Sequence, residues 1–485
     1  MRSQLLILLL TAPLSALAQS SIPNSAADLP AAPRPSSAPL MLAFAAENPG
    51  SSRSQAASPN RQQPLINPAT ATISITRTDA ERLALKNNPR ITASQLLALA
   101  SGQVTRETRS GLLPQISGAM TAEKAEDGSR IGASAGALTD SRLYTHAGTG
   151  GSLSQLITDF GHTRDLVATS KLQEKAQDQT ALATEQDVLL ATDQAYYRLL
   201  NAQSLLDVAK ATVAARGDVQ NLTSALTRSA LKSDLDLNVA SADLSQAQLL
   251  QLDAEDEVAS SSAALAAVLA MPADTVYQAV EDPESAPPPP PSPDSSAALN
   301  AVAQAQRPDL QALRFDAAAD QKFARAQQLQ HLPTISALAI GGISPVSPDG
   351  VFVPHWYAAG GVNLTLPLFT GFRIDAQAQE ARLRQKAAEK QAQDLSDTIA
   401  RDVRVAILNA QTAFRRIAVA DQFRKQTAQA FSLAQTRYKL GLSSIVELSQ
   451  AQLQSTQAAV AAVNARYDYL LSLRSLDYAR GQLAP

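Results

Sequence analysis

RYKLGLSSIVELSQAQ, the stretch from Arg437 to Gln452, decides how the rest of the chain is interpreted. Before it, small and apolar residues recur in alternating steps of four and three, the seam of a helix that packs along a partner helix. Those residues are Ile399, Val403, Ala406, Ala410, Ala413, Ile417 and Ala420. Gly441 falls where a tight reversal needs a positive φ, and Ser443 and Ser444 follow as candidate N-caps. The stretch is therefore predicted to be the tip of a long antiparallel helical hairpin.

A matching tip, ALKSDLDLNVA, lies in the first half of the chain at Ala230 to Ala240. When the two reversals are aligned, Ala230 meets Gly441 and Asp236 meets Glu447. Two proline motifs also recur, and both pairs have the same offset in the numbering. They are Asn88-Pro89-Arg90 with Arg307-Pro308-Asp309, and Leu113-Pro114-Gln115 with Leu332-Pro333-Thr334. Separate motifs in one register indicate that the chain is two copies of one unit.

Pro114 and Pro333 are each expected to end a helix. Each is followed by a region rich in Gly, Ser and Thr, at about 115–160 and 334–369. Two strands are predicted in each region, joined in the first by a polar loop at about Asp127–Gly148. The alternation is clearest at Val362, Leu364, Leu366 and Leu368. The strands pass into helices at junctions marked by Gly161, Pro367 and Gly371. Since no stretch after the N-terminal segment is apolar enough for a membrane helix, any membrane crossing is expected to use the strands.

Very long helical runs follow the junctions, at 163–227 and 372–438, and each would extend on the order of 100 Å. The return helices, at 233–270 and 443–480, are shorter, and so are the helices before the strands. Two short helices stacked end to end beside one long helix would close a uniform cylinder wall.

The N-terminus carries a positive charge at Arg2, an apolar run and an Ala16-Leu17-Ala18 cleavage site, which together predict a signal peptide. The predicted organisation is a signal peptide at 1–18, a disordered Pro/Ser/Ala-rich extension at 19–76, a first repeat at 77–280, a Pro-rich linker at 281–296 and a second repeat at 297–485.

Composition excludes several functions. The net charge of -3 gives no electrostatic case for nucleic acid, and the absence of Cys excludes disulfides and thiolate chemistry. No Gly-rich phosphate loop with Lys occurs, and the four His residues have no metal-ligand spacing. We expect no enzymatic activity, no cofactor and no metal site.

The duplicated units, the SQLITDFG and LPLFTGF junctions and the RYKLGLSSIVELSQAQ tip resemble the outer-membrane efflux protein (TolC-like) family over about Thr78 to Leu483. The resemblance implies a mainly α fold with a small membrane β-barrel, in which three chains form an α-helical tunnel topped by a shared twelve-stranded barrel. It further implies a passive exit duct in the outer membrane of a Gram-negative bacterium, with a long periplasmic portion. The implied partners are two further copies, a periplasmic adaptor (membrane fusion) protein, an inner-membrane pump or ABC exporter, and outer-membrane lipid.

The resemblance also implies that the hairpin tips form a periplasmic gate that is closed at rest. Glu447 falls at a position where family members often place a carboxylate of the ring around the opening. Tyr438 falls where a tip tyrosine contacts the other hairpin, and Asp236 falls at the position of that tyrosine's partner. Ser443 and Gln450 depart from charged residues of the family pattern, so we expect a weaker closure or one held by other contacts. The candidate gate is Glu447, Asp236, Tyr438, Asp234, Gln450 and Ser443, and the candidate adaptor-docking residues are Gly441, Leu440, Leu442, Leu231 and Ala230.

Other interpretations stay open from the residues alone. Acidic residues near the start of a helix are also favoured by the helix dipole, and Tyr438 could simply pack at the turn. A periplasmic coiled-coil adaptor or a secreted filament would also contain long helices, but the adaptor should lack paired strand regions and the filament should show uninterrupted heptads. The exported substrate cannot be inferred, because the same duct would serve drugs, metals or proteins.

Overall fold

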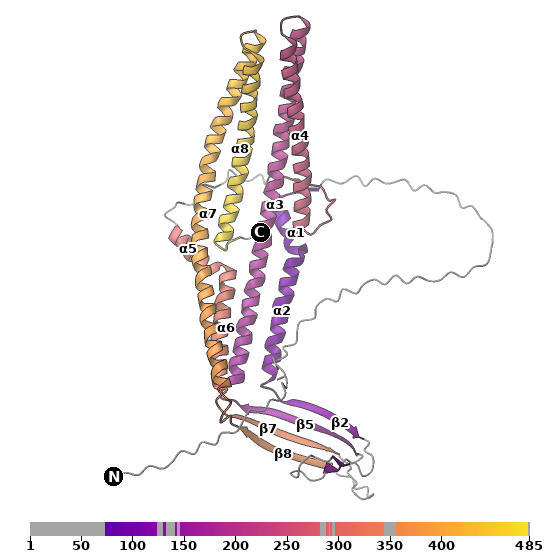
Figure 1. Ribbon diagram of the computed structural model, residues 1–485, viewed down its shortest axis with the longest axis vertical. Helices are drawn as coiled ribbons and strands as arrows, with labels where there is room; N and C mark the ends of the chain where they lie inside the picture. Colours follow the sequence, from indigo (N-terminus) through magenta and orange to yellow (C-terminus); the bar gives the residue numbers. More distant parts are fainter. Residues whose placement is uncertain are drawn as a thin grey trace, which may run out of the picture. The chain divides into compact units, whose positions relative to one another are not determined.

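The computed structural model describes residues 73–123, 130–131, 141–142, 146–281, 288–290, 292, 296–343 and 356–483. The predicted signal peptide and most of the N-terminal extension lie outside this part of the chain, as does much of the Pro-rich linker. Helices dominate what is described (Figure 1). None of the helices in these ranges is both long and apolar enough to cross a membrane.

The helices occur as four pairs of equal length, in the same order in each half of the chain. They are α1 (Arg77–Asn87) and α5 (Ser296–Gln306) with 11 residues each, α2 (Pro89–Ser110) and α6 (Pro308–Leu329) with 22, α3 (His162–Arg228) and α7 (Arg373–Lys439) with 67, and α4 (Asp234–Val268) and α8 (Ile445–Ala479) with 35. The predicted long runs agree with α3 and α7 to within one residue at each end.

Local chemistry explains the break between α1 and α2. Asn88 Oδ1 accepts a hydrogen bond from the Arg90 backbone N–H, and Pro89 occupies the first helical position, where no N–H is needed. A side chain also caps the start of α1. The N-cap is Thr76, whose hydroxyl accepts from the Asp79 backbone N–H at 3.3 Å.

Four long strands form one antiparallel sheet in the order β2–β5–β7–β8, which leaves β2 and β8 at its edges. The strands are β2 (Gln115–Glu123), β5 (His146–Thr158), β7 (Thr334–Ile343) and β8 (Trp356–Thr365). Two predicted boundaries were wrong. β5 begins inside the predicted polar loop, where β3 (Arg130–Ile131) and β4 (Ser141–Arg142) also lie. β8 ends at Thr365, so Leu366 and Leu368 continue the alternation beyond the strand without ladder hydrogen bonds.

A second, parallel sheet was not predicted. It joins β1 (Ile73–Ile75) to β6 (Tyr277–Ala279), with Ile73 opposite Tyr277. The end of the extension predicted to be disordered up to residue 76 is therefore a strand. Three residues are too few to show an alternation in the sequence, and the partner lies at the far end of the first repeat.

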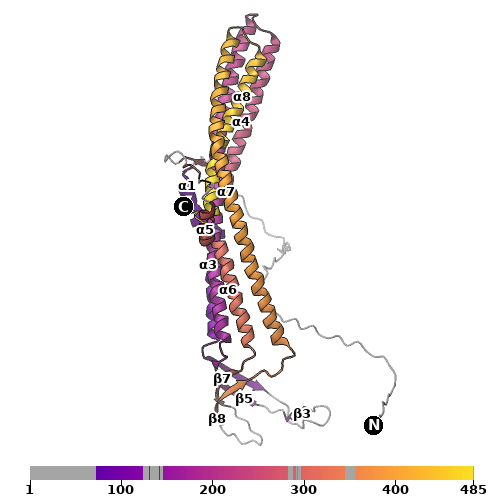
Figure 2. The same ribbon diagram turned by 90° about the vertical axis from the view of Figure 1, so that its left-hand side faces the viewer.

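The long helices follow each other as neighbours in one layer, although toward the tips α4 also touches α8. Near the sheet the order of neighbours is α2, α3, α6, α7, and toward the tips it is α4, α3, α8, α7 (Figure 1). The turned view of Figure 2 shows α3, α6 and α7 side by side near the sheet. One edge of the layer is thus formed by α2 and α4, and the opposite edge by α7. The buried residues of α7 include Ile399, Val403, Ala410 and Ala413 of the predicted seam, together with Ile407.

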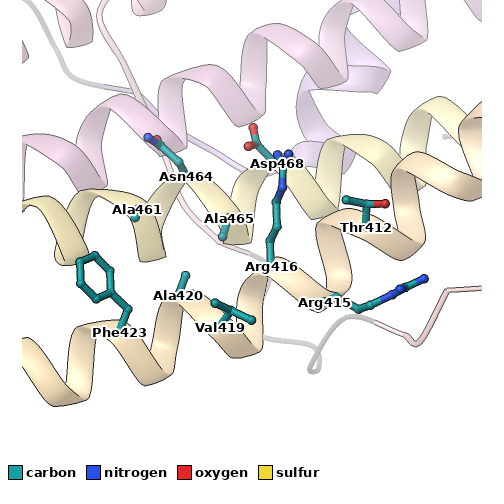
Figure 3. A pocket seen from close by; sticks show the side chains of 10 residues that line it. All are labelled: Thr412, Arg415, Arg416, Val419, Ala420, Phe423, Ala461, Asn464, Ala465 and Asp468. Carbon is teal, nitrogen blue, oxygen red and sulfur yellow. The ribbon is translucent and has the colours of Figure 1, made fainter.

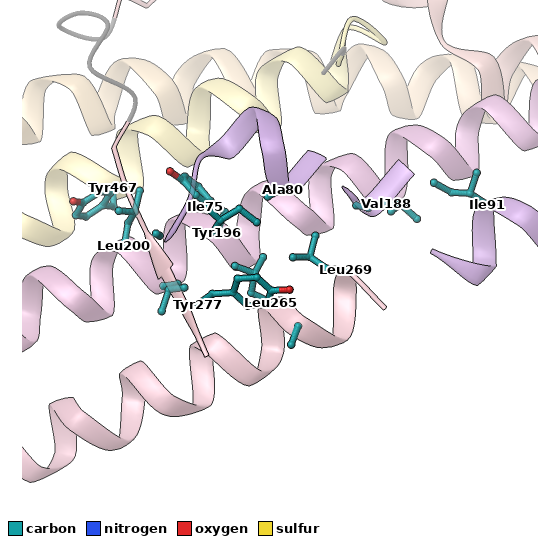
Figure 4. Packing of buried hydrophobic residues seen from close by; sticks show 14 residues of the cluster. Ile75, Ala80, Ile91, Val188, Tyr196, Leu200, Leu265, Leu269, Tyr277 and Tyr467 are labelled. Atoms are coloured by element: carbon teal, nitrogen blue, oxygen red, sulfur yellow. The ribbon is translucent and has the colours of Figure 1, made fainter. Parts of the chain in front are cut away.

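Bulky buried side chains gather around the small parallel sheet (Figure 4). Tyr196 and Leu199 of α3, Leu265 of α4 and Tyr277 of β6 are at most 2% exposed. Tyr196 Oη donates to the Val280 carbonyl at 2.5 Å, so its polar atom is satisfied. This cluster fixes where α1, α3, α4 and α8 meet.

Each long helix and each return helix ends in the same backbone motif, with one residue of positive φ. At the first tip the Leu231 N–H reaches the Leu226 carbonyl, and at the second the Leu442 N–H reaches the Arg437 carbonyl. The positive-φ positions are Ala230 (φ 56), Ala270 (φ 53), Gly441 (φ 75) and Gly481 (φ 69). The first repeat therefore uses Ala where the second uses Gly.

We predict that Gly441→Ala and Gly481→Ala lower the free energy of unfolding by different amounts. A Cβ at Gly441 meets nothing within 4 Å, so the substitution should cost only the left-handed strain, ~1 kcal/mol. A Cβ at Gly481 would lie 2.9 Å from the Arg307 backbone nitrogen, so its cost should be clearly larger. Urea unfolding of the detergent-solubilised protein measures both, with Ala230→Gly as a nearly neutral control. Equal losses for the two alanine variants would contradict this account.

Candidate functional site

The two hairpin tips present apolar side chains to solvent. Leu231, Leu440 and Leu442 are each about two-thirds exposed, and Ala230 and Gly441 supply the positive φ that lets each chain reverse. Two exposed residues of the following helices, Leu235 and Val446, extend these apolar surfaces. Each tip therefore offers an apolar surface on a rigid turn, a feature typical of a protein-binding site.

Tyr438 lies at the end of α7 and is completely buried between the hairpins. Its hydroxyl is 3.2 Å from Thr223 Oγ1 of α3, and Lys232 Nζ of the first tip stands 4.5 Å from its ring centroid. Lys232 also donates to the Ser443 carbonyl at 3.5 Å. Burial raises the pKa of Tyr438, and the nearby charge of Asp236 adds to this effect. These contacts join the two tips through a neutral tyrosine and a cation.

The predicted partnership of Asp236 with Tyr438 needs correction. The Asp236 carboxylate accepts from the Ser233 backbone N–H at 3.3 Å, while Ser233 Oγ accepts from the Asp236 N–H at 3.2 Å. This capping box holds the first turn of α4, which also contains Asp234. Among the described residues, Thr223 rather than Asp236 makes the hydrogen bond to the Tyr438 hydroxyl.

Glu447 is half-exposed in the first turn of α8. Its backbone N–H donates to Ser444 Oγ, which makes Ser444 rather than Ser443 the N-cap. Its carboxylate is 3.5 Å from Arg437 Nη1 of the same hairpin. Gln450 is exposed and Ser443 is half-buried. Glu447 and Asp234 are thus the predicted gate carboxylates on exposed residues, and Arg437 partly neutralises the charge of Glu447.

A polar contact that was not predicted from the sequence joins the two hairpins on the sheet side of the tips. We use the term inter-hairpin clamp for Arg216 of α3, Asp243 of α4 and Ser449 of α8. Arg216 is 5% exposed, pairs with the Asp243 carboxylate and donates to Ser449 Oγ at 3.3 Å. Ser449 Oγ donates to Asp243 Oδ2 at 2.6 Å. Burial lowers the pKa of Arg216, but the Asp243 charge opposes that effect and keeps the guanidinium charged.

Other polar pairs continue the α3–α8 contact away from the tips. They are Thr212 with Thr456 at 3.4 Å, Ser204 with Tyr467 at 2.9 Å, and Asn201 with Asn464 at 3.0 Å. Hydrogen bonds of this kind can be exchanged for water at modest cost, unlike a bulky apolar core. Apolar side chains such as Leu448 and Tyr467 of α8 also pack at this contact, so both kinds of interaction hold it.

Shallow grooves run between neighbouring helices. One between α7 and α8 has a volume of about 550 Å³, and Figure 3 shows Arg416 of α7 reaching toward Asp468 of α8 beside apolar Val419 and Phe423. A second, of about 480 Å³, lies between α4 and α8 next to the inter-hairpin clamp. Neither groove is enclosed. Within the described ranges no group of three or more His, Asp or Glu side chains could hold a metal ion.

The strand–helix junctions contain two successive residues of positive φ. They are Phe160 and Gly161 before α3, and Gly371 and Phe372 before α7. Asp159 accepts backbone N–H groups of Gly161 and Thr163. Burial opposes the Asp159 charge, but the hydrogen bonds from Thr163 and Gly161 outweigh it and lower the pKa.

Large apolar side chains surround these junctions and face solvent. Phe369 and Phe372 are each more than 70% exposed and pack edge to face, with ring centroids 5.8 Å apart. Leu368, between Pro367 and Phe369, is 88% exposed. An exposed aromatic surface of this kind is typical of contact with lipid or with another chain.

The family model described as outer membrane efflux protein matches residues 81–271 and 299–482. The outer membrane protein TolC of Vibrio cholerae serotype O1 is 25% identical over 405 residues, which are 83% of this chain and 89% of that protein. The solved structure of VceC from Vibrio cholerae gives a TM-score of 0.73 at 19% identity and covers 84% of this chain and 96% of VceC. The CmeC outer membrane channel of Campylobacter jejuni gives 0.71 at 21% identity, covering 84% and 85%.

We predict that Arg216→Met destabilises the protein by about 2–4 kcal/mol, because it leaves the Asp243 carboxylate half-buried without its cation. Ser449→Ala should cost about 1 kcal/mol, the value of one hydrogen bond. Denaturant unfolding of the two single variants and the double variant gives the coupling energy. If the losses simply add, the three residues do not act as a unit.

Proposed function

Because the chain belongs to the outer membrane efflux protein family, we propose that it is the outer-membrane duct of a tripartite efflux or type I export system. Three copies would form a continuous passage from the periplasm to the outside of a Gram-negative cell. The duct would supply no energy itself. That would come from an inner-membrane pump or ABC exporter, joined to the duct by a periplasmic adaptor protein.

The observation that carries this proposal is that the open edges of the helical layer and the open edges of the sheet lie on corresponding sides of the chain. α2 and α4 form one edge of the helical layer and α7 forms the other. β2, which follows α2, and β8, which precedes α7, are the two edges of the sheet. One rotation that places α7 of one copy against α2 and α4 of the next would therefore also place β8 beside β2. Repeating that rotation closes every layer at once, as a heterologous ring requires.

Closure would remove the unpaired backbone groups at the sheet edges, which cannot persist in lipid. With four strands from each chain, three copies give a twelve-stranded barrel. The number three comes from the family resemblance. Phe369 and Phe372, exposed where β8 passes into α7, would then lie at the periplasmic surface of the membrane, where aromatic side chains are favoured.

The inter-hairpin clamp and the Tyr438–Thr223 contact would hold the tips closed at rest. This closure uses a buried Arg, a neutral Tyr and Lys232, while the Asp236 carboxylate serves as a helix cap. Opening would then require α8 to separate from α3. The Arg216→Met variant tests this step as well, since its channels should open more often than those of the wild type.

The exposed leucines of both tips would form the docking surface for the adaptor. Leu231 of the first tip and Leu440 and Leu442 of the second are apolar, while the neighbouring caps are polar. An apolar centre with a polar rim is the usual composition of a specific protein interface.

We predict that Leu99→Cys combined with Leu383→Cys allows chemical cross-linking of three chains. Leu99 of α2 and Leu383 of α7 are both more than half exposed, lie a similar distance from the sheet end of their helices, and are separated within one chain by α3 and α6. The natural chain has no Cys, so a flexible bismaleimide would react only at these two positions. Denaturing gels should show a ladder that ends at the trimer.

Each single-Cys variant is the matched control and should remain monomeric on the gel. A product that stops at the dimer would indicate a two-fold interface and would contradict the ring. A soluble protein with no cross-linked product would instead favour the alternative function, a periplasmic coiled-coil adaptor or structural protein without a pore.

We predict that Glu447→Gln reduces the cation preference of the channel. The carboxylate is exposed in the first turn of α8, and its removal leaves Arg437 unpaired at the entrance. Reversal potentials in planar bilayers under a salt gradient measure the change, with Glu255→Gln, an exposed carboxylate far along α4, as the control. Unchanged selectivity would keep the duct and remove Glu447 from its entrance.

A further inference from the structure

The open faces of α4 and α7, which form opposite edges of the helical layer, carry opposite charges. Asp253 and Asp256 of α4 and Arg415 of α7 are exposed, and none of the three has an ion-pair partner within the described part of the chain. In Figure 3, Arg415 is directed away from Asp468, whereas its neighbour Arg416 reaches toward that residue. A cation at one edge and carboxylates at the other are therefore available to a second chain.

The internal duplication indicates which residues would meet there. The two hairpins have helices of equal length, so each position of the first has an equivalent at a constant offset in the second, as Ala230 has in Gly441. Within the chain, α3 of the first hairpin packs on α8 of the second. In the proposed ring, α7 of one copy packs on α4 of the next, which is the equivalent arrangement. The contacts between α3 and α8 are therefore a template for the contacts between copies.

One hydrogen bond of the template becomes an ion pair between copies. Ser204 Oγ of α3 lies 2.9 Å from Tyr467 Oη of α8. The equivalent of Ser204 is Arg415, and the equivalent of Tyr467 is Asp256. An arginine of one copy and an aspartate of the next thus take the places of two neutral hydroxyl groups.

A second polar contact of the template supports the same pairing. Asn201 Nδ2 of α3 donates to Asn464 Oδ1 of α8 at 3.0 Å. Their equivalents are Thr412 of α7 and Asp253 of α4. A threonine hydroxyl can donate to a carboxylate, so this contact can also form between copies. Its carboxylate would add to the negative charge that faces Arg415.

Apolar side chains lie next to these charges on the same helix faces. Val419 is one turn from Arg415 and Leu252 is one turn from Asp256, each in the direction of its tip. Val419 is 68% exposed and Leu252 is 60% exposed. Contact between the two copies would cover both, so the charged pair would lie beside an apolar contact.

The strongest charged contact of the α3–α8 seam has no counterpart between copies. Arg474 Nε of α8 is 2.6 Å from Asp193 Oδ2 of α3, and its Nη2 is 2.9 Å from Glu81 Oε1 of α1. The equivalent of Arg474 in α4 is Ala263, which has no charge. Any ion pair that joins two copies along α4 must therefore involve other residues.

We propose that Arg415 of one copy forms an ion pair with Asp256 of the next copy, and that this pair fixes the height at which the copies join. This inference rests on the proposed ring, and the partner is a second copy of this chain. Charges across an interface contribute more to the choice of partner and register than to affinity, because like charges brought together repel. A shift of one helix along the other would separate Arg415 from Asp256.

The first test reverses the charges in the full-length protein. Arg415→Glu places a carboxylate against Asp256, so the temperature at which the detergent-solubilised trimer separates into single chains should fall by several degrees. Adding Asp256→Arg restores opposite charges and should restore the wild-type temperature. Arg416→Glu is the matched control, and Asp256→Arg should not restore it, because Arg416 is directed toward Asp468 of its own chain. Native gel electrophoresis after heating measures the trimer.

A second measurement tests the choice of partner. Wild type is co-expressed with the double variant Arg415→Glu, Asp256→Arg, each with a different affinity tag. Seams between like chains have opposite charges, whereas every seam between unlike chains has like charges. Trimers that carry both tags should therefore be depleted about tenfold relative to wild type co-expressed with a differently tagged copy of itself.

The outcomes separate the ion pair from the duct. A trimer whose stability is unchanged by Arg415→Glu, or unlike chains that mix freely, would overturn the pair and keep the ring. A stable trimer that no longer binds its adaptor after Arg415→Glu would assign this surface to the adaptor and would also overturn the pair. A wild type that is a single chain in detergent would contradict the proposed duct, and the pair with it.

Discussion

A wall that is one helix thick has no interior, so each helix is stabilised only along the narrow seams that it shares with its neighbours. This constraint explains the alanine-rich composition. Ala202 and Ala209 of α3, Ala410 of α7 and Ala458 of α8 are all at most 2% exposed. Small residues let the backbones approach along the whole seam, where a larger side chain would force them apart. Bulky residues are fully buried around the parallel sheet, as Tyr196 is, and also elsewhere along the seams, as Tyr438 and Tyr469 are.

The same constraint decides what could be predicted from the sequence. A seam repeated over many turns gives a strong period, Pro89 and Pro308 mark where α2 and α6 begin, and Gly441 marks the reversal after α7. The long helices and their reversals were therefore predictable. β1 and β6 were not, because a three-residue strand has no period and its partner is distant in the chain. The end of β8 was misplaced because alternation continues through Leu368 although the ladder ends at Thr365.

For the candidate site, the sequence located the tips but not their side-chain partners. Spacing along one helix says which residues share a face. The choice between Thr223 and Asp236 for Tyr438 depends on how α3, α4 and α7 are rotated about their own axes. Arg216 and Glu81 were missed for a related reason. In the sequence they look like the many charged residues of exposed helix faces, and only the packing of three helices around each of them shows that they are buried.

Internal duplication gives the two hairpins the same backbone, but the polar side chains that join them do not repeat. The position equivalent to Arg216 in the second repeat is Thr427, and the position equivalent to Arg474 in the first is Ala263. Within the chain, the seam between hairpins is formed by α3 and α8 and carries these polar contacts, while α4 and α7 lie at the edges. In the proposed ring, seams of two kinds would therefore alternate. Alanine and leucine would hold both kinds at the same spacing, and the buried Arg, Tyr and carboxyl groups would determine which kind separates first. A gate requires such an inequality, since a wall with identical seams would have no preferred place to open.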